Sequence, residues 1–203
     1  MYGTVGGGFW SEGFDESDVK YALNSIKTPL VNIHLNSNGG DVFSGIAIGH
    51  LFKNSDKTIH VYNDAMVASA ATIIAMGADK IFAPRNTMMM VHRASTFMMG
   101  HASDLRNMAD DLDKVDESLV QSYLNRFNGS RSELENLLDG KGDGTFLTAE
   151  ESVAYGFADE LLDPIVEDNE EDEELIENKQ QETFRNKRVN RFAAMLDSFN
   201  KPK

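Results

Sequence analysis

The sequence predicts an α/β fold in which stacked βαβ units form a mostly parallel sheet. Between residues 30 and 92, short strand-like apolar segments alternate with longer segments at helical spacing, which is the element order of βαβ units. The chain has 203 residues, about one domain with an appendage. An apolar stripe over residues 103–127 adds one helix that is long for a domain of this size.

The first predicted unit runs from residue 30 to residue 53. Every second residue from 31 to 35 is apolar, which indicates a strand. The Gly39-Gly40 pair ends this strand, and Asp41 follows as a residue that can cap a helix. The predicted helix carries an apolar series: Val42, Ile46, Ile48, Leu51 and Phe52.

The next elements follow at similar spacing. Residues 58–62 predict a second strand, which leads through a turn at Asn63-Asp64 into an apolar helix over 68–78. Two further short strands are expected at 80–83 and 87–92. We expect all these strands to belong to one sheet.

The predicted helix over 103–127 is roughly 25 residues, or about 37 Å, long. Its apolar stripe has spacings of three and four: Leu105, Met108, Leu112, Val115, Leu119, Tyr123 and Phe127. The opposite face is acidic: Asp104, Asp110, Asp111, Asp113, Asp116 and Glu117. The pattern leaves two interpretations open, because the stripe could pack on the protein's own core or partly on another subunit.

Composition excludes several classes of function. The chain has 19 basic and 33 acidic residues, a net charge of −14, which argues against a nucleic-acid or anionic-membrane partner. Without cysteine there is no disulfide, thiolate metal site or cysteine nucleophile. The start of the chain lacks a signal-peptide pattern, and its most apolar stretch is shorter than the roughly 20 residues of a membrane span. We therefore expect a soluble, cytoplasmic protein.

The composition changes sharply near Pro164. An acidic block at 167–177 is followed by a mainly basic stretch at 179–191. Such a segment buries too little apolar surface to offset its ordering entropy. We therefore divide the chain into a folded domain, 1–164, and a charged tail, 165–203, that is disordered or ordered by a partner.

Ser69 is the candidate nucleophile. It precedes a predicted helix and follows a strand, at the edge of the sheet where sites form in α/β proteins. Free N–H groups at a helix start, such as that of Ala70, favour a developing oxyanion. Gly40 can supply a second such N–H, because glycines allow the backbone to approach a ligand closely. A helix-capping serine and an ordinary tight turn would show the same patterns.

His92 is the candidate general base, because imidazole accepts a proton near neutral pH. Of the five histidines, His92 is the one that lies at the end of a predicted strand. A histidine base needs an acid to orient it, and Asp143, in the glycine-rich segment 139–147, is our candidate. A buried structural histidine and a solvated turn aspartate are the alternative interpretations.

With these residues the sequence resembles the Clp protease proteolytic-subunit family, and especially its bacteriophage branch, the ClpP-like head maturation (prohead) proteases. Four motifs carry the resemblance, in the family's order: Asn36-Ser37-Asn38-Gly39-Gly40, Ala65-Met66-Val67-Ala68-Ser69-Ala70-Ala71, Met88-Met89-Met90-Val91-His92 and Phe146-Leu147-Thr148-Ala149-Glu150-Glu151. The likeness runs from about residue 2 to residue 161.

The resemblance implies Ser69 as nucleophile, His92 as base, and the N–H groups of Gly40 and Ala70 as the oxyanion hole. Counting back from Phe146, the family's acid falls on Gly144, one residue after Asp143. Either the loop shifts so that Asp143 reaches His92, or the protein works with a dyad. Loss of a triad acid can cost about four orders of magnitude in rate.

For the whole molecule, the resemblance implies a crotonase-like αβ spiral with residues 103–127 as a protruding handle helix. It implies a homo-oligomer of seven-membered rings stacked in pairs as a tetradecamer. The expected activity is that of a serine protease that needs no metal, no cofactor and, by itself, no ATP. The phage branch implies capsid or scaffold precursors as substrates, processed in the infected host's cytoplasm or in the procapsid.

Two other functions remain open at this stage. A crotonase-type enzyme would use the same two N–H groups to polarise an acyl-CoA thioester, but gives no reason for a serine and a histidine at two strand ends. An inactive ring that serves only in assembly is favoured by the glycine at position 144.

Overall fold

The computed structural model describes residues 1–7 and 12–163. Its main sheet has six strands, in which β7, β6, β4, β5 and β8 follow one another and β3 pairs with β4. The strand bounds are Leu30–Ser37 (β3), Thr58–Ala68 (β4), Lys80–Pro84 (β5), Met88–Val91 (β6), Thr145–Thr148 (β7) and Glu160–Leu162 (β8). All pairs are parallel except β6 with β7. The predicted α/β class with a mostly parallel sheet is confirmed.

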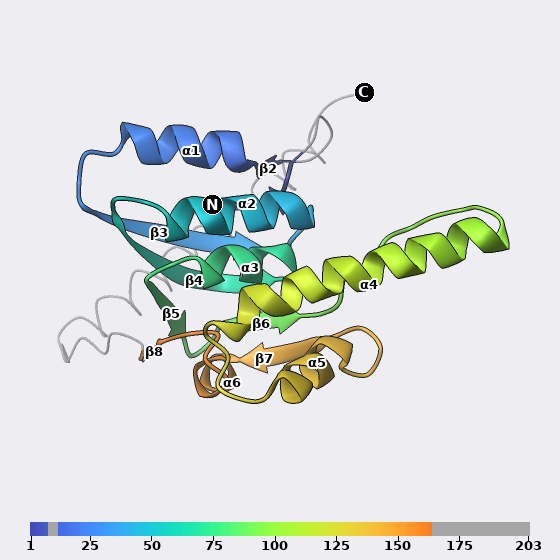
Figure 1. Ribbon diagram of the computed structural model, residues 1–203. Helices are drawn as coiled ribbons and strands as arrows, with labels where there is room; N and C mark the ends of the chain where they lie inside the picture. Colours follow the sequence, from blue (N-terminus) through green and yellow to red (C-terminus); the bar gives the residue numbers. More distant parts are fainter. Residues whose placement is uncertain (8–11, 164–203) are drawn as a thin grey trace, which may run out of the picture. The chain divides into compact units, whose positions relative to one another are not determined.

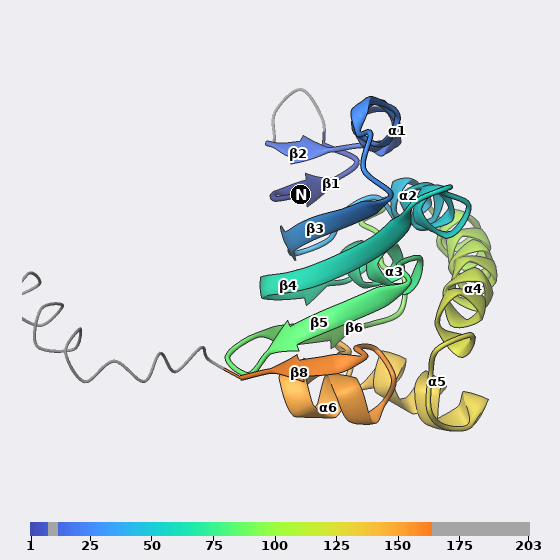
Figure 2. The same cartoon turned by 90° about the vertical axis from the view of Figure 1, so that its left-hand side faces the viewer.

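Six helices accompany the sheet within the described residues: α1 (Glu16–Ser25), α2 (Val42–Lys53), α3 (Ala70–Met76), α4 (Ala102–Leu124), α5 (Arg131–Asp139) and α6 (Ala149–Ala154). Figure 2 shows α2, α3 and α4 on the same face of strands β3 to β5. A small parallel pair, β1 (Thr4–Val5) and β2 (Gly13–Phe14), lies beside the start of α2. Apolar side chains of the sheet and of these helices form one buried core.

The first βαβ unit forms as predicted. β3 covers the alternating segment, and Val31, Ile33 and Leu35 are buried. The Asp41 side chain caps α2 by accepting a hydrogen bond from the N–H of Ser44, at 2.7 Å. The predicted strands at 80–83 and 87–92 correspond to β5 and β6.

The predicted turn at Asn63-Asp64 is wrong. β4 continues through these residues to Ala68, and the following helix is therefore short, Ala70–Met76. Asn63 is buried, and its side-chain N–H donates to the carbonyl oxygen of Met88 at 2.9 Å. A neighbouring strand thus accepts the side-chain N–H of a residue that local preferences assign to a turn, while Asn63 Oδ1 has no partner among the described residues.

α4 agrees closely with the predicted long helix, and it starts after His101 as N-cap. Its stripe divides into two halves. The C-terminal half is buried: Leu119, Tyr123 and Phe127. In the N-terminal half, Leu105 is 47% exposed, and Figure 1 shows that this half extends beyond the sheet together with the loop 92–101. The core interpretation therefore holds for the inner half only.

Several elements were not predicted: α1, α5, β7, β8 and the small sheet. Two of the helices have recognisable capping boxes, Asp15 with Asp18 and Ser130 with Glu133. β7 lies in the segment that we predicted as a turn, and its pairing with β6 depends on tertiary contact. No helix among the described residues is long and apolar enough to cross a membrane. The predicted tail, 165–203, lies outside those residues.

Candidate active site

Ser69 and His92 meet because the strands that precede them are neighbours. β4 and β6 run parallel, with Ala68 opposite Met90, so the residues that follow the two strands emerge side by side at the same edge of the sheet. His92 Nε2 lies 2.7 Å from Ser69 Oγ. This is the contact that a general base needs in order to take the proton of a serine nucleophile.

The backbone at Ser69 is strained. With φ 56° and ψ −130°, Ser69 is the one non-glycine residue of the described chain with a positive φ. Its N–H donates to the carbonyl oxygen of Met90 at 2.8 Å, which holds the sharp turn from β4 into α3 against β6. Such strain costs about 1–3 kcal/mol and concentrates at functional sites. The turn presents the serine hydroxyl to His92.

The two glycines after β3 pack directly on this turn. A Cβ atom at Gly39 would lie 2.5 Å from Ser69 Cβ and 3.0 Å from the nitrogen of Ala70, so only glycine allows this approach. Within the described residues, the N–H groups of Gly40 and Ala70 have no hydrogen-bond acceptor. They are thus available for a developing negative charge.

Gly40, Ser69, Ala70 and His92 line one cavity of about 300 Å³. The structure therefore brings together the four residues that the sequence suggested for the nucleophile, the base and the oxyanion hole. The wall opposite them is mainly apolar and comes from α3 and α4: Ile73, Met108, Leu112, Val115 and Leu119. An extended peptide with an apolar side chain fits such a groove.

Asp143 is near His92 but not bonded to it. Both residues line a second cavity of about 470 Å³, yet the described residues contain no hydrogen bond between them, and Asp143 is exposed. Gly144 lies directly against His92, because a Cβ at position 144 would overlap the Cβ of His92 and the carbonyl oxygen of Val91. Within the described chain, His92 Nδ1 has no hydrogen-bond partner.

Arg93 and Asp116 are functional candidates that the sequence analysis missed. Asp116 is 6% exposed, so its predicted place on the acidic solvent face is wrong. Its carboxylate accepts the N–H of Ala94 at 2.6 Å and lies 3.4 Å from Arg93 Nη1. Arg93 also pairs with Asp139, and this hydrogen bond lowers the pKa of the Asp139 carboxyl. The spacing 112, 116, 119, 123 was a usable signal, because it places residue 116 at the edge of the buried stripe.

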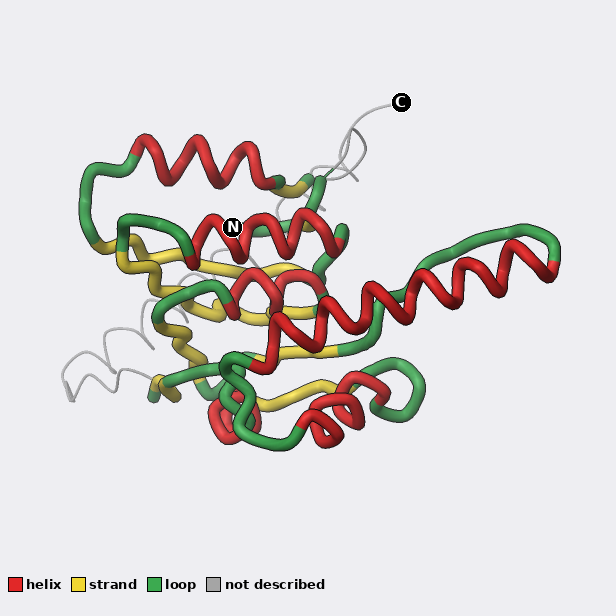
Figure 3. Tube along the Cα trace, viewed as in Figure 1, coloured by secondary structure: helices red, strands yellow, loops and turns green. Residues whose placement is uncertain are grey.

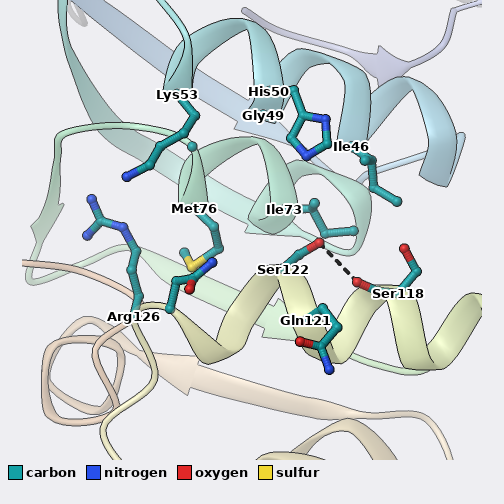
Figure 4. Close-up of a pocket in the computed structure, with 12 residues that line it drawn as sticks. Ile46, Gly49, His50, Lys53, Ile73, Met76, Ser118, Gln121, Ser122 and Arg126 are labelled. Atoms are coloured by element: carbon teal, nitrogen blue, oxygen red, sulfur yellow. Dashed lines mark hydrogen bonds between the residues drawn. The ribbon is translucent and has the colours of Figure 1, made fainter.

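Within the described chain, the other four histidines make no hydrogen bond to a serine hydroxyl. His34 Nδ1 lies 2.8 Å from Asp64, His60 packs against Phe82, and His101 caps α4. His50 lines a third cavity, of about 320 Å³, between α2, α3 and α4 (Figure 4).

Among the described residues, His50 makes no hydrogen bond to the serines of this third cavity, Ser118 and Ser122. Lys53, His50 and Arg126 give it a basic lining. The guanidinium group of Arg126 is already bound to Asp159, at 2.8 and 3.0 Å. Among residues 1–7 and 12–163, no group of three or more metal-binding side chains could hold an ion.

Comparisons with known proteins show the family and the fold of the chain. The profile of the Clp protease family matches residues 21–164. The ATP-dependent Clp protease proteolytic subunit of Deinococcus radiodurans is 26% identical over 135 residues, and the match spans 66% of this chain and 65% of that protein, a little under two thirds of its length. Among solved structures, a ClpP1 mutant from Listeria monocytogenes is similar with a TM-score of 0.63 and 23% identity, covering 74% of this chain and 85% of the other. The last comparison confirms the predicted ClpP-like α/β fold.

Proposed function

The chain belongs to the Clp protease family, and from this we propose that it is a serine endopeptidase with Ser69 as nucleophile and His92 as general base. The observation that carries the proposal is the 2.7 Å contact between Ser69 Oγ and His92 Nε2, made at a strained strand-to-helix turn. A serine that merely caps a helix needs neither the strain nor the histidine.

The reaction is acyl transfer. Ser69 Oγ attacks the peptide carbonyl carbon while His92 Nε2 takes the hydroxyl proton. The carbonyl oxygen becomes an oxyanion that accepts hydrogen bonds from the N–H groups of Gly40 and Ala70. His92 then gives its proton to the leaving amine, and the acyl-enzyme forms. Water, deprotonated by His92, releases the second product and restores the serine.

Asp143 is the proposed acid of this site. The cavity that it shares with His92 and the absence of a side chain at Gly144 leave it a path toward Nδ1. The segment carries three glycines with positive φ: Gly140, Gly142 and Gly144. A small change in this loop could bring the carboxylate to His92. If Asp143 does not act, the enzyme is a Ser69–His92 dyad.

A fluorophosphonate probe tests the nucleophile directly. We expect one adduct per chain, located on Ser69 by peptide mass spectrometry, because the probe phosphonylates activated serines and releases fluoride. Ser69→Ala should abolish labelling. Ser118→Ala, which removes an exposed hydroxyl on α4 away from the groove, is the matched control and should label at the parent rate. Labelling that persists in Ser69→Ala would contradict Ser69 as the nucleophile. A parent that never labels would favour an inactive assembly module.

We extend the proposal to a ring-forming homo-oligomer. The arm made of the loop 92–101 and the outer half of α4 exposes large apolar side chains: Phe97, Met99 and Leu105, at 90, 83 and 47%. Apolar surface of this kind favours contact with a second copy. From the family resemblance we further propose heptameric rings stacked in pairs, with capsid or scaffold precursors as substrates, as in the phage branch.

Light scattering of the full chain tests this assembly. We expect a particle of seven or fourteen chains of 22.5 kDa each. Leu105→Glu should reduce its mass, because it places a charge in the apolar contact. Asn107→Glu, an equal charge on an exposed position of the same helix, should leave the mass unchanged. A monomer at micromolar concentration would argue against the ring.

The acyl-CoA alternative has less support from the site. A thioester-polarising enzyme needs the two N–H groups but no hydrogen bond between a serine and a histidine. Hydrolysis of an unfolded protein, with no turnover of acyl-CoA thioesters, is the expected outcome when both substrate classes are offered.

A further inference from the structure

α4 contacts a residue close to Ser69 and another close to His92, namely the side chain of Thr72 and the backbone N–H of Ala94. We propose that this helix positions both residues, through Asp116 on the side of His92 and Tyr123 on the side of Ser69. The inference rests on the proposed function, because it assigns positioning residues to that same site. Asp116 and Tyr123 are about two helical turns apart, so they lie on one face of α4.

Asp116 holds the segment that follows the histidine. Its two carboxylate oxygens bind different groups: one accepts the Ala94 N–H at 2.6 Å, and the other lies 3.4 Å from the guanidinium of Arg93. Arg93 is the residue directly after His92, and its second partner, Asp139, is the last residue of α5. The backbone just beyond the imidazole is therefore tied to α4 and to α5.

Tyr123 acts on the other side of the site through one intermediate residue. Thr72 Oγ1 lies 2.6 Å from the Ser69 carbonyl oxygen and 2.6 Å from the Tyr123 hydroxyl. Because the threonine proton is donated to the carbonyl, the tyrosine must donate to Thr72. Tyr123 is 1% exposed and burial raises its pKa to about 12, so the phenol keeps the proton that it donates.

The Asp116 carboxylate and the Tyr123 hydroxyl are buried polar groups, although apolar side chains would suffice for packing at these positions. A buried carboxylate carries a desolvation penalty, and replacing a buried ion pair with apolar residues is often neutral or stabilising. The other acidic residues of α4 near Asp116, namely Asp110, Asp111, Asp113 and Glu117, are exposed. The position of Asp116 is thus explained by what its carboxylate holds, which is the main chain beside His92.

The same helix carries the exposed arm. In Figure 3 the loop after β6 runs alongside α4 to its outer end before the helix returns toward the sheet. Loss of either contact with α4 would release one side of the site and so change the distance between Ser69 Oγ and His92 Nε2. An error of about 1 Å in such a distance can cost about a hundredfold in rate.

The test compares variants by the rate of fluorophosphonate labelling, resolved into the maximal rate and the half-saturating probe concentration. We expect Asp116→Ala to lower the maximal rate about 10- to 100-fold with little change in half-saturation. Asp116→Asn keeps an oxygen acceptor for the Ala94 N–H and should retain most of the rate. Asp113→Asn makes the same charge change at an exposed position of α4 and should match the parent.

Stability is measured on the same samples, so that positioning is separated from folding. A structural role alone would lower the unfolding temperature and leave the maximal rate of the folded fraction unchanged, which would overturn the inference. If Asp116→Ala does not fold, Tyr123→Phe carries the test, because it keeps the shape and removes only the donor to Thr72; we expect a rate reduction of about tenfold. If the parent labels and all these variants label at the same rate, the positioning role is refuted but the proposed function is not. If the parent does not label, the proposed function itself is refuted.

Discussion

His92→Ala is expected to lower the kcat for peptide hydrolysis by about a millionfold, close to the loss found when the serine or histidine of a catalytic triad is removed. Without the imidazole 2.7 Å away, the Ser69 hydroxyl keeps its proton and the leaving amine receives none. The measurement is turnover of a fluorogenic peptide, corrected for the folded fraction. His50→Ala is the matched control, because His50 lines the separate cavity of Figure 4. Equal losses in both variants would contradict the assignment of His92.

Asp143→Ala belongs to the same series and separates a triad from a dyad. If Asp143 orients His92, its loss should reduce kcat by up to about four orders of magnitude; an unchanged rate would leave Ser69 and His92 as a dyad. Gly144→Asp should not restore a triad, because the φ of 85° and the contact with the Cβ of His92 leave no room for a side chain there.

Gly39→Ala is expected to lower kcat by about two to three orders of magnitude. The added Cβ would lie 2.5 Å from the Ser69 Cβ and 2.8 Å from the carbonyl oxygen of Ala68. The second of these is a backbone atom, so the strained turn and the neighbouring N–H of Ala70 must move. Losing one oxyanion donor costs about 10²–10³ in kcat, and a misplaced nucleophile adds to this.

Gly142→Ala is the matched control for stability in the Gly39→Ala experiment. Gly142 also has a positive φ, 112°, but a Cβ there would meet no atom within 4 Å. Gly142→Ala should therefore lower the free energy of unfolding by only about 1–2 kcal/mol, from backbone strain alone. Gly39→Ala should cost more, as measured by denaturant unfolding. Equal losses in the free energy of unfolding would mean that the turn accommodates the Cβ of Gly39→Ala without a clash. The predicted loss of activity would then fail too.

Local patterns explain which elements of the fold were predictable. The alternation in β3, the Asp41 cap of α2 and the stripe of α4 are set by residues close together in the chain. The turn predicted at Asn63 was wrong because the contact that decides its structure is not local. Its preference for turns is local, whereas its hydrogen bond to Met88 joins two strands.

The sequence by itself determined the class of fold, the order along the chain of most of its central strands and helices, and four residues able to form an acyl-transfer site. Side-chain periodicity and capping carry that information, since both act within a few residues. Only the tertiary structure decided that the ends of β4 and β6 lie side by side, and so that Ser69 and His92 touch. It alone buried Asp116 against the Ala94 N–H and placed Gly144, without a side chain, beside the imidazole. The order of the strands within the sheet, their register and the docking of the helices depend on contacts between distant segments, which no local pattern specifies.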